Sequence, residues 1–401
     1  MENIVKDTNK QRGGRSNKEF WRIINLLNLC LIFIISYYFV LMQVSGMIAA
    51  DITQHIAFLD QYFKGIVYIP HPIWHTGTYY FGRILNTDLG TAASLFTALL
   101  ITLYSITIYK VSQSLDDSPG NEARWYLVTM IALTIGPFFV MSLNPHIYMG
   151  PGSPSVWHNV TLLTVQPFVL LSVFFTVKFF ISDNLKYFAL ALLIAVLSIF
   201  AKPNFIIVFL PSLVVYMLFK KFFNKRQLLF VLIAILLSVA ALAYQFMNQY
   251  ENDSGSTGGS VIFDFLGVWS LYTPSVTVSI LMALGLPILI TIFNFQSVKK
   301  NEYIQFSWLL VLFSMILFSC FAEGGKRYAE GNFSWSWHLS LSLIYIFTII
   351  EYFKQYFTMP GVVRYPLLAV MLYQVYVGWY FLIGMFNGIS CRATIDAFPF
   401  F

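Results

Sequence analysis

The chain has 401 residues, of which 58% are hydrophobic and only 10% are charged. Soluble domains carry about 25% charged residues, which keep their surfaces in solution, so this composition excludes an ordinary soluble enzyme. Intrinsic disorder is excluded too, because it needs few apolar residues and many charges. The three cysteines are far apart and predict neither a disulfide framework nor a zinc site. The composition indicates an all-α integral membrane protein.

A membrane-spanning helix needs about 20 mostly apolar residues. Windows of that size predict about eleven spans, at 22–44, 90–111, 125–143, 160–181, 187–201, 204–219, 228–247, 275–295, 304–321, 337–353 and 365–385. Only Lys202 and Pro203 separate 187–201 from 204–219, so this pair is either two short spans or one long broken helix.

The spans form a polytopic domain over 22–385, between a basic tail over 1–21 and a short tail over 386–401. Cytoplasmic loops of membrane proteins concentrate Lys and Arg. With eleven spans and a cytoplasmic N-terminus, 18 of the 24 basic residues lie inside, whereas the 18 acidic residues divide evenly. We therefore expect a cytoplasmic N-terminus and an outer C-terminus, and we interpret the net charge of +6 as an orientation signal rather than a nucleic-acid-binding surface.

The long loops all fall on the outer side in this topology, where we expect the functional residues: 45–89, 144–159, 248–274 and 322–336. In the first, Asp51 follows the end of span one and His55 comes four residues later. That spacing places both on one helix face, so the carboxylate could be a general base that the imidazole orients. The alternative is that Asp51 caps a short interfacial helix.

His71 and His75 lie in the same loop. Together with Asp51 they could bind a divalent metal. Histidine and aromatic side chains also anchor helices at the membrane interface, which is the alternative interpretation.

Trp157, His158 and Asn159 end the second outer loop. A Trp ring offers a flat face to a sugar, and His and Asn offer hydrogen bonds to its hydroxyls. Alternatively, Trp157 is an interfacial belt residue and Asn159 caps the next helix.

Outer cations are scarce, and three of them occupy distinctive places. Lys202 lies alone between two apolar segments, and Lys326 and Arg327 are adjacent in the fourth outer loop. Cations at the membrane surface suit a lipid phosphate or pyrophosphate, although long basic side chains also simply extend to lipid headgroups.

The layout resembles the GT-C glycosyltransferases: a first span, an outer loop opening on Asp51-xxx-His55, and many spans with no nucleotide motif. The resemblance implies a GT-C-like fold and a polyprenyl-phosphate sugar donor used on the outer face. By match of place, Asp51 would take the acidic catalytic position. His158, Lys202, Lys326 and Arg327 match no family motif and are candidates on their chemistry alone. Several family members add a soluble C-terminal domain, whereas here the tail is short, so acceptor recognition would fall to the loops.

The expected activity is transfer of a sugar, with inversion, to an envelope glycan or lipid acceptor. Asp51 would be the base, and Lys202, Lys326 and Arg327 would neutralise the leaving phosphate. The expected partners are the lipid-linked donor, a glycan or glycolipid acceptor and membrane lipids, with no nucleic acid. High Ile, Phe and Asn usage is typical of an AT-rich bacterial genome, and we expect the protein in a bacterial plasma membrane with the site facing outward.

Three other activities stay open. A polymerase or ligase of lipid-linked glycans also works on the outer face, where it relies on arginines and one large loop. An acyltransferase could use an outer histidine as base. A flippase for lipid-linked sugars needs a charged path, and no predicted span carries an ionisable residue at mid depth.

Overall fold

The computed structural model describes residues 2–116, 121–252, 260–390 and 393–394, without the side chains of 2–19, 22, 249–252 and 326. Parts of the predicted tails and of the 248–274 loop, and the side chain of Lys326, therefore lie outside the described residues. In the described part, eight helices are long and apolar enough to cross a membrane. They are α1 (Glu2–Val44, apolar from Ile23), α4 (Leu89–Leu115), α6 (Val160–Ser182), α9 (Lys225–Asn252), α11 (Val276–Phe293), α13 (Glu302–Cys320), α14 (Ser334–Gln355) and α15 (Gly361–Phe386).

The remaining elements are shorter. They are α2 (Ile52–Phe63), α3 (Ile73–Leu85), α5 (Glu122–Thr134), α7 (Leu185–Ala201), α8 (Asn204–Lys220), α10 (Gly267–Ser270), α12 (Phe295–Val298), the 3-10 helix η1 (Gly325–Glu330) and the strands β1 (Val261–Phe263) and β2 (Phe321–Glu323). The two strands pair antiparallel, with Ile262 opposite Ala322. This pairing joins the third and fourth predicted outer loops.

The segment between α7 and α8 is a true break between two helices of 17 residues each. Lys202 is extended (φ −167°, ψ 119°) because a residue that precedes proline avoids the helical region. Pro203 then opens α8. Both helices are shorter than the 18 residues of the shortest candidate span, so the choice between two short spans and one broken helix stays a prediction.

The expected continuous span over 125–143 is wrong. Helix α5 covers 13 residues and ends at Thr134, because Gly136 and Pro137 follow and proline disfavours a helix in the residue before it. The next segment is extended, and the N–H of Gly136 donates to the carbonyl of Gln374 in α15. A Cβ at Gly378 would lie 1.8 Å from the carbonyl oxygen of Thr134, so this close crossing requires glycine. The predicted total of eleven spans is therefore not confirmed.

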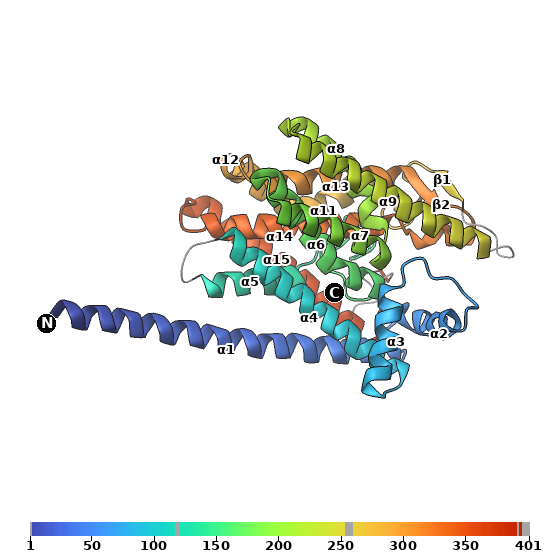
Figure 1. Cartoon of the computed structure of the whole chain (residues 1–401), viewed down its shortest axis with the longest axis horizontal. Coiled ribbons are helices and arrows are strands. Elements are labelled where there is room, and N and C mark those ends of the chain that lie inside the picture. The colour runs from blue at the N-terminus through green and yellow to red at the C-terminus, as the bar shows by residue number, and fades with distance from the viewer. Residues whose placement is uncertain (1, 117–120, 253–259, 391–392, 395–401) are drawn as a thin grey trace.

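The helices are arranged as a bundle with two distinct ends (Figure 1). α1 runs along one edge, and its N-terminal part projects beyond the other helices. At the opposite end lie α2, α3, β1 and β2, which come from the predicted outer loops. The polar loops that carry the candidate residues therefore gather at one end of the bundle.

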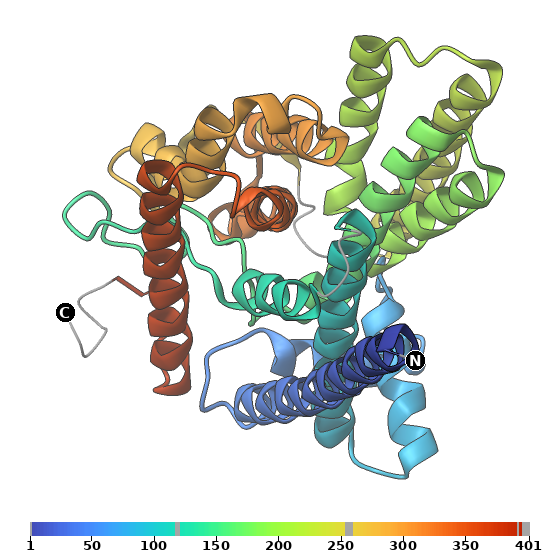
Figure 2. The ribbon, with the colours of Figure 1, turned by 90° about the vertical axis from the view of Figure 1, so that its left-hand side faces the viewer.

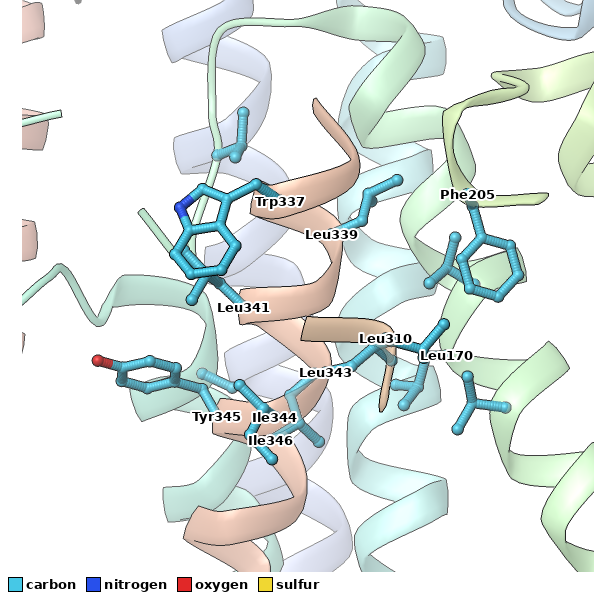
Figure 3. Close-up of a cluster of buried hydrophobic side chains, with 14 of the residues drawn as sticks. Leu170, Phe205, Leu310, Trp337, Leu339, Leu341, Leu343, Ile344, Tyr345 and Ile346 are labelled. Atoms are coloured by element: carbon cyan, nitrogen blue, oxygen red, sulfur yellow. The ribbon is translucent and has the colours of Figure 1, made fainter. Parts of the chain in front are cut away.

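Helix α14 is the centre of the bundle, since 94% of its apolar window is buried inside the protein. It appears nearly end-on, in orange-red, near the middle of Figure 2. Its side chains pack on both sides: Trp337, Leu341 and Tyr345 point one way, and Leu339 and Leu343 point the other, towards Leu310 (Figure 3).

Small serines on α14 help the neighbouring helices to approach and supply hydrogen bonds between them. Ser342 contacts the Tyr104 hydroxyl at 2.6 Å, and Ser336 donates to the carbonyl of Asn204 at 2.8 Å. The start of α14 is thereby held against the start of α8, directly beside Lys202.

Candidate functional site

Asp51 lies at the turn between α1 and α2. It occupies the cap position of α2, yet its side chain makes no capping hydrogen bond, so the capping interpretation is wrong for the carboxylate. Oδ2 instead accepts a hydrogen bond from Asn159 Nδ2 at 2.9 Å and lies 3.5 Å from His55 Nε2. Oδ1 has no partner within the described part of the chain. The carboxylate is oriented by two groups and keeps a free oxygen.

His55 connects Asp51 to a second, deeper histidine. Its Nδ1 lies 3.1 Å from Nε2 of His75, which is only 1% exposed. Burial, reinforced by His55, lowers the pKa of His75 to about 3, so His75 is neutral at physiological pH. The proton in this contact belongs to either ring, so the tautomers of the two histidines are coupled. A change at His75 is therefore transmitted to the His55 nitrogen that faces Asp51.

Asn159 links this group to α6. As the cap of α6, its Oδ1 accepts the backbone N–H of Leu162 at 2.8 Å and the hydroxyl of Thr161 at 2.9 Å. Because backbone and hydroxyl donors occupy the amide oxygen, the amide nitrogen has to face Asp51. The capping interpretation of Asn159 is confirmed, and the cap also fixes the direction of its hydrogen bond to Asp51.

Lys202 supplies a buried cation next to this pair. It is 7% exposed, its Nζ donates to Thr161 Oγ1 at 2.8 Å, and Nζ lies 3.4 Å from Asn159 Oδ1. Burial lowers the pKa of Lys202 to about 8, although the charge of Asp51 opposes this shift. No carboxylate in the described part of the chain makes a direct ion pair with Lys202, so its charge is available to an anionic ligand.

The ionisation of Asp51 depends on the same neighbours. Burial opposes the charged carboxylate, but the contact with His55 and the charges of His55, His158 and Lys202 outweigh it. The pKa of Asp51 therefore lies below its ordinary value. An ionised carboxylate and a buried ammonium share one amide, which is an arrangement able to accept a proton and stabilise a negative charge within a single site.

The segment 321–336, here called the strap, crosses beside Lys202. Trp335 lies in the strap with its ring centroid 5.3 Å from Lys202 Nζ, at the distance of a cation–π contact. The carbonyl of Asn332 accepts a hydrogen bond from Asn204 at 2.8 Å, which ties the strap to the start of α8. Trp335 was not predicted as a site residue, because no local feature of the sequence distinguishes it from the other aromatic residues of this loop.

Arg327 is also in the strap, but it is already paired. Its Nε lies 3.3 Å from Glu323 and 3.1 Å from Glu330, and the side chain is half exposed. Its charge contributes to lowering the pKa of Lys202. Arg327 would have to leave two carboxylates to contact a phosphate directly.

Of the remaining predicted residues, His158 belongs to the site and Trp157 does not. His158 is 6% exposed, and its ring centroid lies 6.0 Å from that of Trp335, so it belongs to the site. Trp157 points elsewhere: its indole N–H donates to the carbonyl of Leu133 and its ring packs edge-on against Phe39. The aromatic surface next to Lys202 is provided by Trp335, and Trp157 lies in the packed interior.

The expected metal ligands do not form a ligand set. Among the described residues, no group of three or more His, Cys, Asp or Glu side chains is placed to hold a metal ion. The pKa of His71 is well below its ordinary range, because of burial first and then the nearby Lys202 charge.

Comparison with known proteins adds little at the level of sequence, because no family model and no curated protein matches the chain. Among solved structures, the crystal structure of an Archaeoglobus fulgidus oligosaccharyltransferase in its apo form is similar. The TM-score is 0.49 and the identity 11%, over 90% of this chain. The chain spans 56% of the length of that protein's chain. A likeness of this extent does not decide activity, which has to be argued from the site.

Proposed function

We propose that the protein is a membrane glycosyltransferase that moves a sugar from a polyprenyl-phosphate donor to a glycan or lipid acceptor, with Asp51 as the general base. The observation that carries the proposal is the bridge through Asn159. One amide contacts both the Asp51 carboxylate and the Lys202 ammonium, which lie 151 positions apart in the sequence. Such a pair provides a proton acceptor and a binding group for a phosphate side by side.

The reaction follows from these two groups. Asp51 takes the proton of an acceptor hydroxyl, and that oxygen attacks the anomeric carbon of the sugar. The bond from that carbon to the phosphate oxygen breaks, and its electrons stay with the departing polyprenyl phosphate. Lys202 stabilises this developing charge because it is buried and preorganised by Thr161 and Asn159. Attack from the face opposite the phosphate inverts the anomeric configuration.

The surrounding residues fit a sugar between base and cation. The Trp335 ring offers a flat face next to Lys202, and the His158 ring lies beside it. In this proposal Arg327, which is paired with two carboxylates, guides the anionic lipid rather than contacting the leaving oxygen, and Lys326 keeps the phosphate-binding role predicted from the sequence. We place the site on the outer face of a bacterial plasma membrane, within a GT-C-like fold.

The test is transfer activity in membranes supplied with polyprenyl-phosphate sugars. Asp51→Asn should abolish transfer while leaving donor binding in place, because the base is lost and Lys202 remains. Asp60→Asn is a matched control, since Asp60 lies on the same helix α2, is 58% exposed and, among the described residues, pairs only with Lys64. Full transfer by the Asp51→Asn variant would exclude Asp51 as the base.

Donor binding is tested separately through the cation. Membranes that contain the Lys202→Met variant should no longer bind the donor but should still bind the acceptor. The identity of the bound lipid distinguishes the glycosyltransferase from the main alternative. A lipid monophosphate with one sugar supports the glycosyltransferase, whereas a pyrophosphate-linked oligosaccharide supports a polymerase or ligase. Because Arg327 is engaged by two carboxylates, no described contact favours the arginine-dependent polymerase reaction.

A further inference from the structure

A cavity of about 170 Å³ lies between α1, α4 and α5, far from Asp51. Its residues on α1 run from Asn25 to Ile32, so at about 1.5 Å per residue its far end lies some 28 Å along the helix from Val44 and its near end about 18 Å. The separation of Val44 from the far end is close to the thickness of a bilayer core, about 30 Å. The cavity and the Asp51 site therefore belong to opposite membrane faces.

The lining of the cavity changes character with depth. α1 and α4 run in opposite directions, since Val44 at the end of α1 packs on Gly90 at the start of α4. Lys110 on α4 and Asn25 on α1 consequently lie at the same end. Leu29 and Ile106 lie about one turn deeper. Ser105 and Thr129 also line the deeper part, but their hydroxyls donate to backbone carbonyls of their own helices, which leaves that wall largely apolar. A charged rim above a largely apolar wall matches the order of groups in a phospholipid.

The polar end of the cavity carries an unpaired positive charge. Lys110 is exposed, and its Nζ contacts Gln113 Oε1 at 3.1 Å, with no ion pair in the described part of the chain. Arg124, by contrast, is held by Asp116 at 2.9 Å. No acidic side chain is among the described residues that line the cavity. A cation at headgroup depth between membrane helices is the feature that retains lipid phosphates.

The size of the cavity fits part of a lipid chain. Dry protein cavities of about 150 Å³ bind a molecule as large as benzene, so this one admits a short hydrocarbon segment. Ile106 is 36% exposed and forms a wall that faces the bilayer, which lets the rest of the chain continue into the membrane. We infer that this cavity binds one glycerophospholipid of the leaflet opposite the Asp51 site, with its chain against Leu29 and Ile106 and its phosphate at Lys110.

The experiment measures retention of dioleoylphosphatidylglycerol by the full-length protein, by native mass spectrometry from detergent. Ile106→Trp should fill the cavity and abolish retention of the one bound lipid. Leu103→Trp is the matched control, since Leu103 is also an exposed apolar residue of α4 (46% exposed) but does not line the cavity. Equal retention by the wild type and a folded Ile106→Trp variant would overturn the inference.

The phosphate contact is tested with a second pair of variants. Lys110→Ala should reduce retention about fivefold, the effect expected for one basic residue near the membrane surface. Lys186→Ala, which removes another exposed lysine remote from the cavity, should leave retention unchanged. Equal losses in both lysine variants would show a nonspecific charge effect and overturn the assignment of the phosphate to Lys110. None of these outcomes depends on the proposed transferase activity.

Discussion

Exchanging Asp51 and Asn159 separates the structural role of their hydrogen bond from its chemical role. In the single variant Asn159→Asp, the new carboxylate still caps α6, because it can accept the Leu162 N–H. It also faces the Asp51 carboxylate across the present 2.9 Å contact. Two unit charges at that distance repel by about 6 kcal/mol at an effective dielectric constant of about 20.

Part of this repulsion will be relieved. Asp51 is 34% exposed, which screens it, and Lys202 lies 3.4 Å from the amide oxygen that the new carboxylate replaces. We therefore expect Asn159→Asp to lose about 2 to 3 kcal/mol of stability at neutral pH and to recover it as the pH falls and one carboxylate is protonated. The sign follows because protonation removes the repulsion only in the folded state.

The double variant Asp51→Asn/Asn159→Asp restores one amide and one carboxylate. Its thermal stability in detergent should return to within about 1 kcal/mol of the wild type, which a double-mutant cycle would report as coupling. Its transfer activity should not return, because the carboxylate now lies on α6 against Lys202. Wild-type transfer by the double variant would refute Asp51 as the positioned base, and wild-type stability of Asn159→Asp would refute the assigned direction of the hydrogen bond.

Four further predictions follow from the same site. Donor binding should weaken above about pH 8, where Lys202 loses its proton, and Lys202→Arg should move this limit upward; a binding profile that is flat from pH 7 to 10 in the wild type would contradict the role of the ammonium. The lowered pKa of Lys202 also affects stability. The free energy of unfolding should rise between about pH 8 and pH 10.5, the ordinary pKa of lysine, because the unfolded chain binds more protons than the folded chain in that range. His75→Leu should lower kcat about tenfold and alter its pH profile, because His55 is then free to change tautomer. His75→Gln can still form the hydrogen bond and should retain most activity. Equal kcat values for the wild type and His75→Leu would contradict the positioning role. Trp335→Ala should raise the KM for the donor about fivefold with little change in kcat, and Trp335→Phe should raise it less; a loss confined to kcat would show that the ring does not bind the donor.

Much of the fold was visible in the sequence because hydropathy is a local property. Apolar stretches of about 20 residues marked the long helices, and Pro203 marked the break beside Lys202. The spacing of Asp51 and His55 also brought these side chains together as expected, since one helical turn joins them. The early end of α5 had a local signal too, in Gly136 and Pro137, but the apolar character of 135–143 masked it.

Only the tertiary structure decided which distant residues share the site. Asn159 meets Asp51 across 108 positions, and Trp335 meets Lys202 across 133. Local propensity carries no information about such pairs, because they depend on how α6, α8 and α14 pack. The same packing turned Trp157 into the interior and gave Asn159 its second role beyond the cap. The sequence by itself determined that this is a helical membrane protein whose scarce polar residues gather in a few loops. Packing around the buried helix α14 decided which of those residues became neighbours.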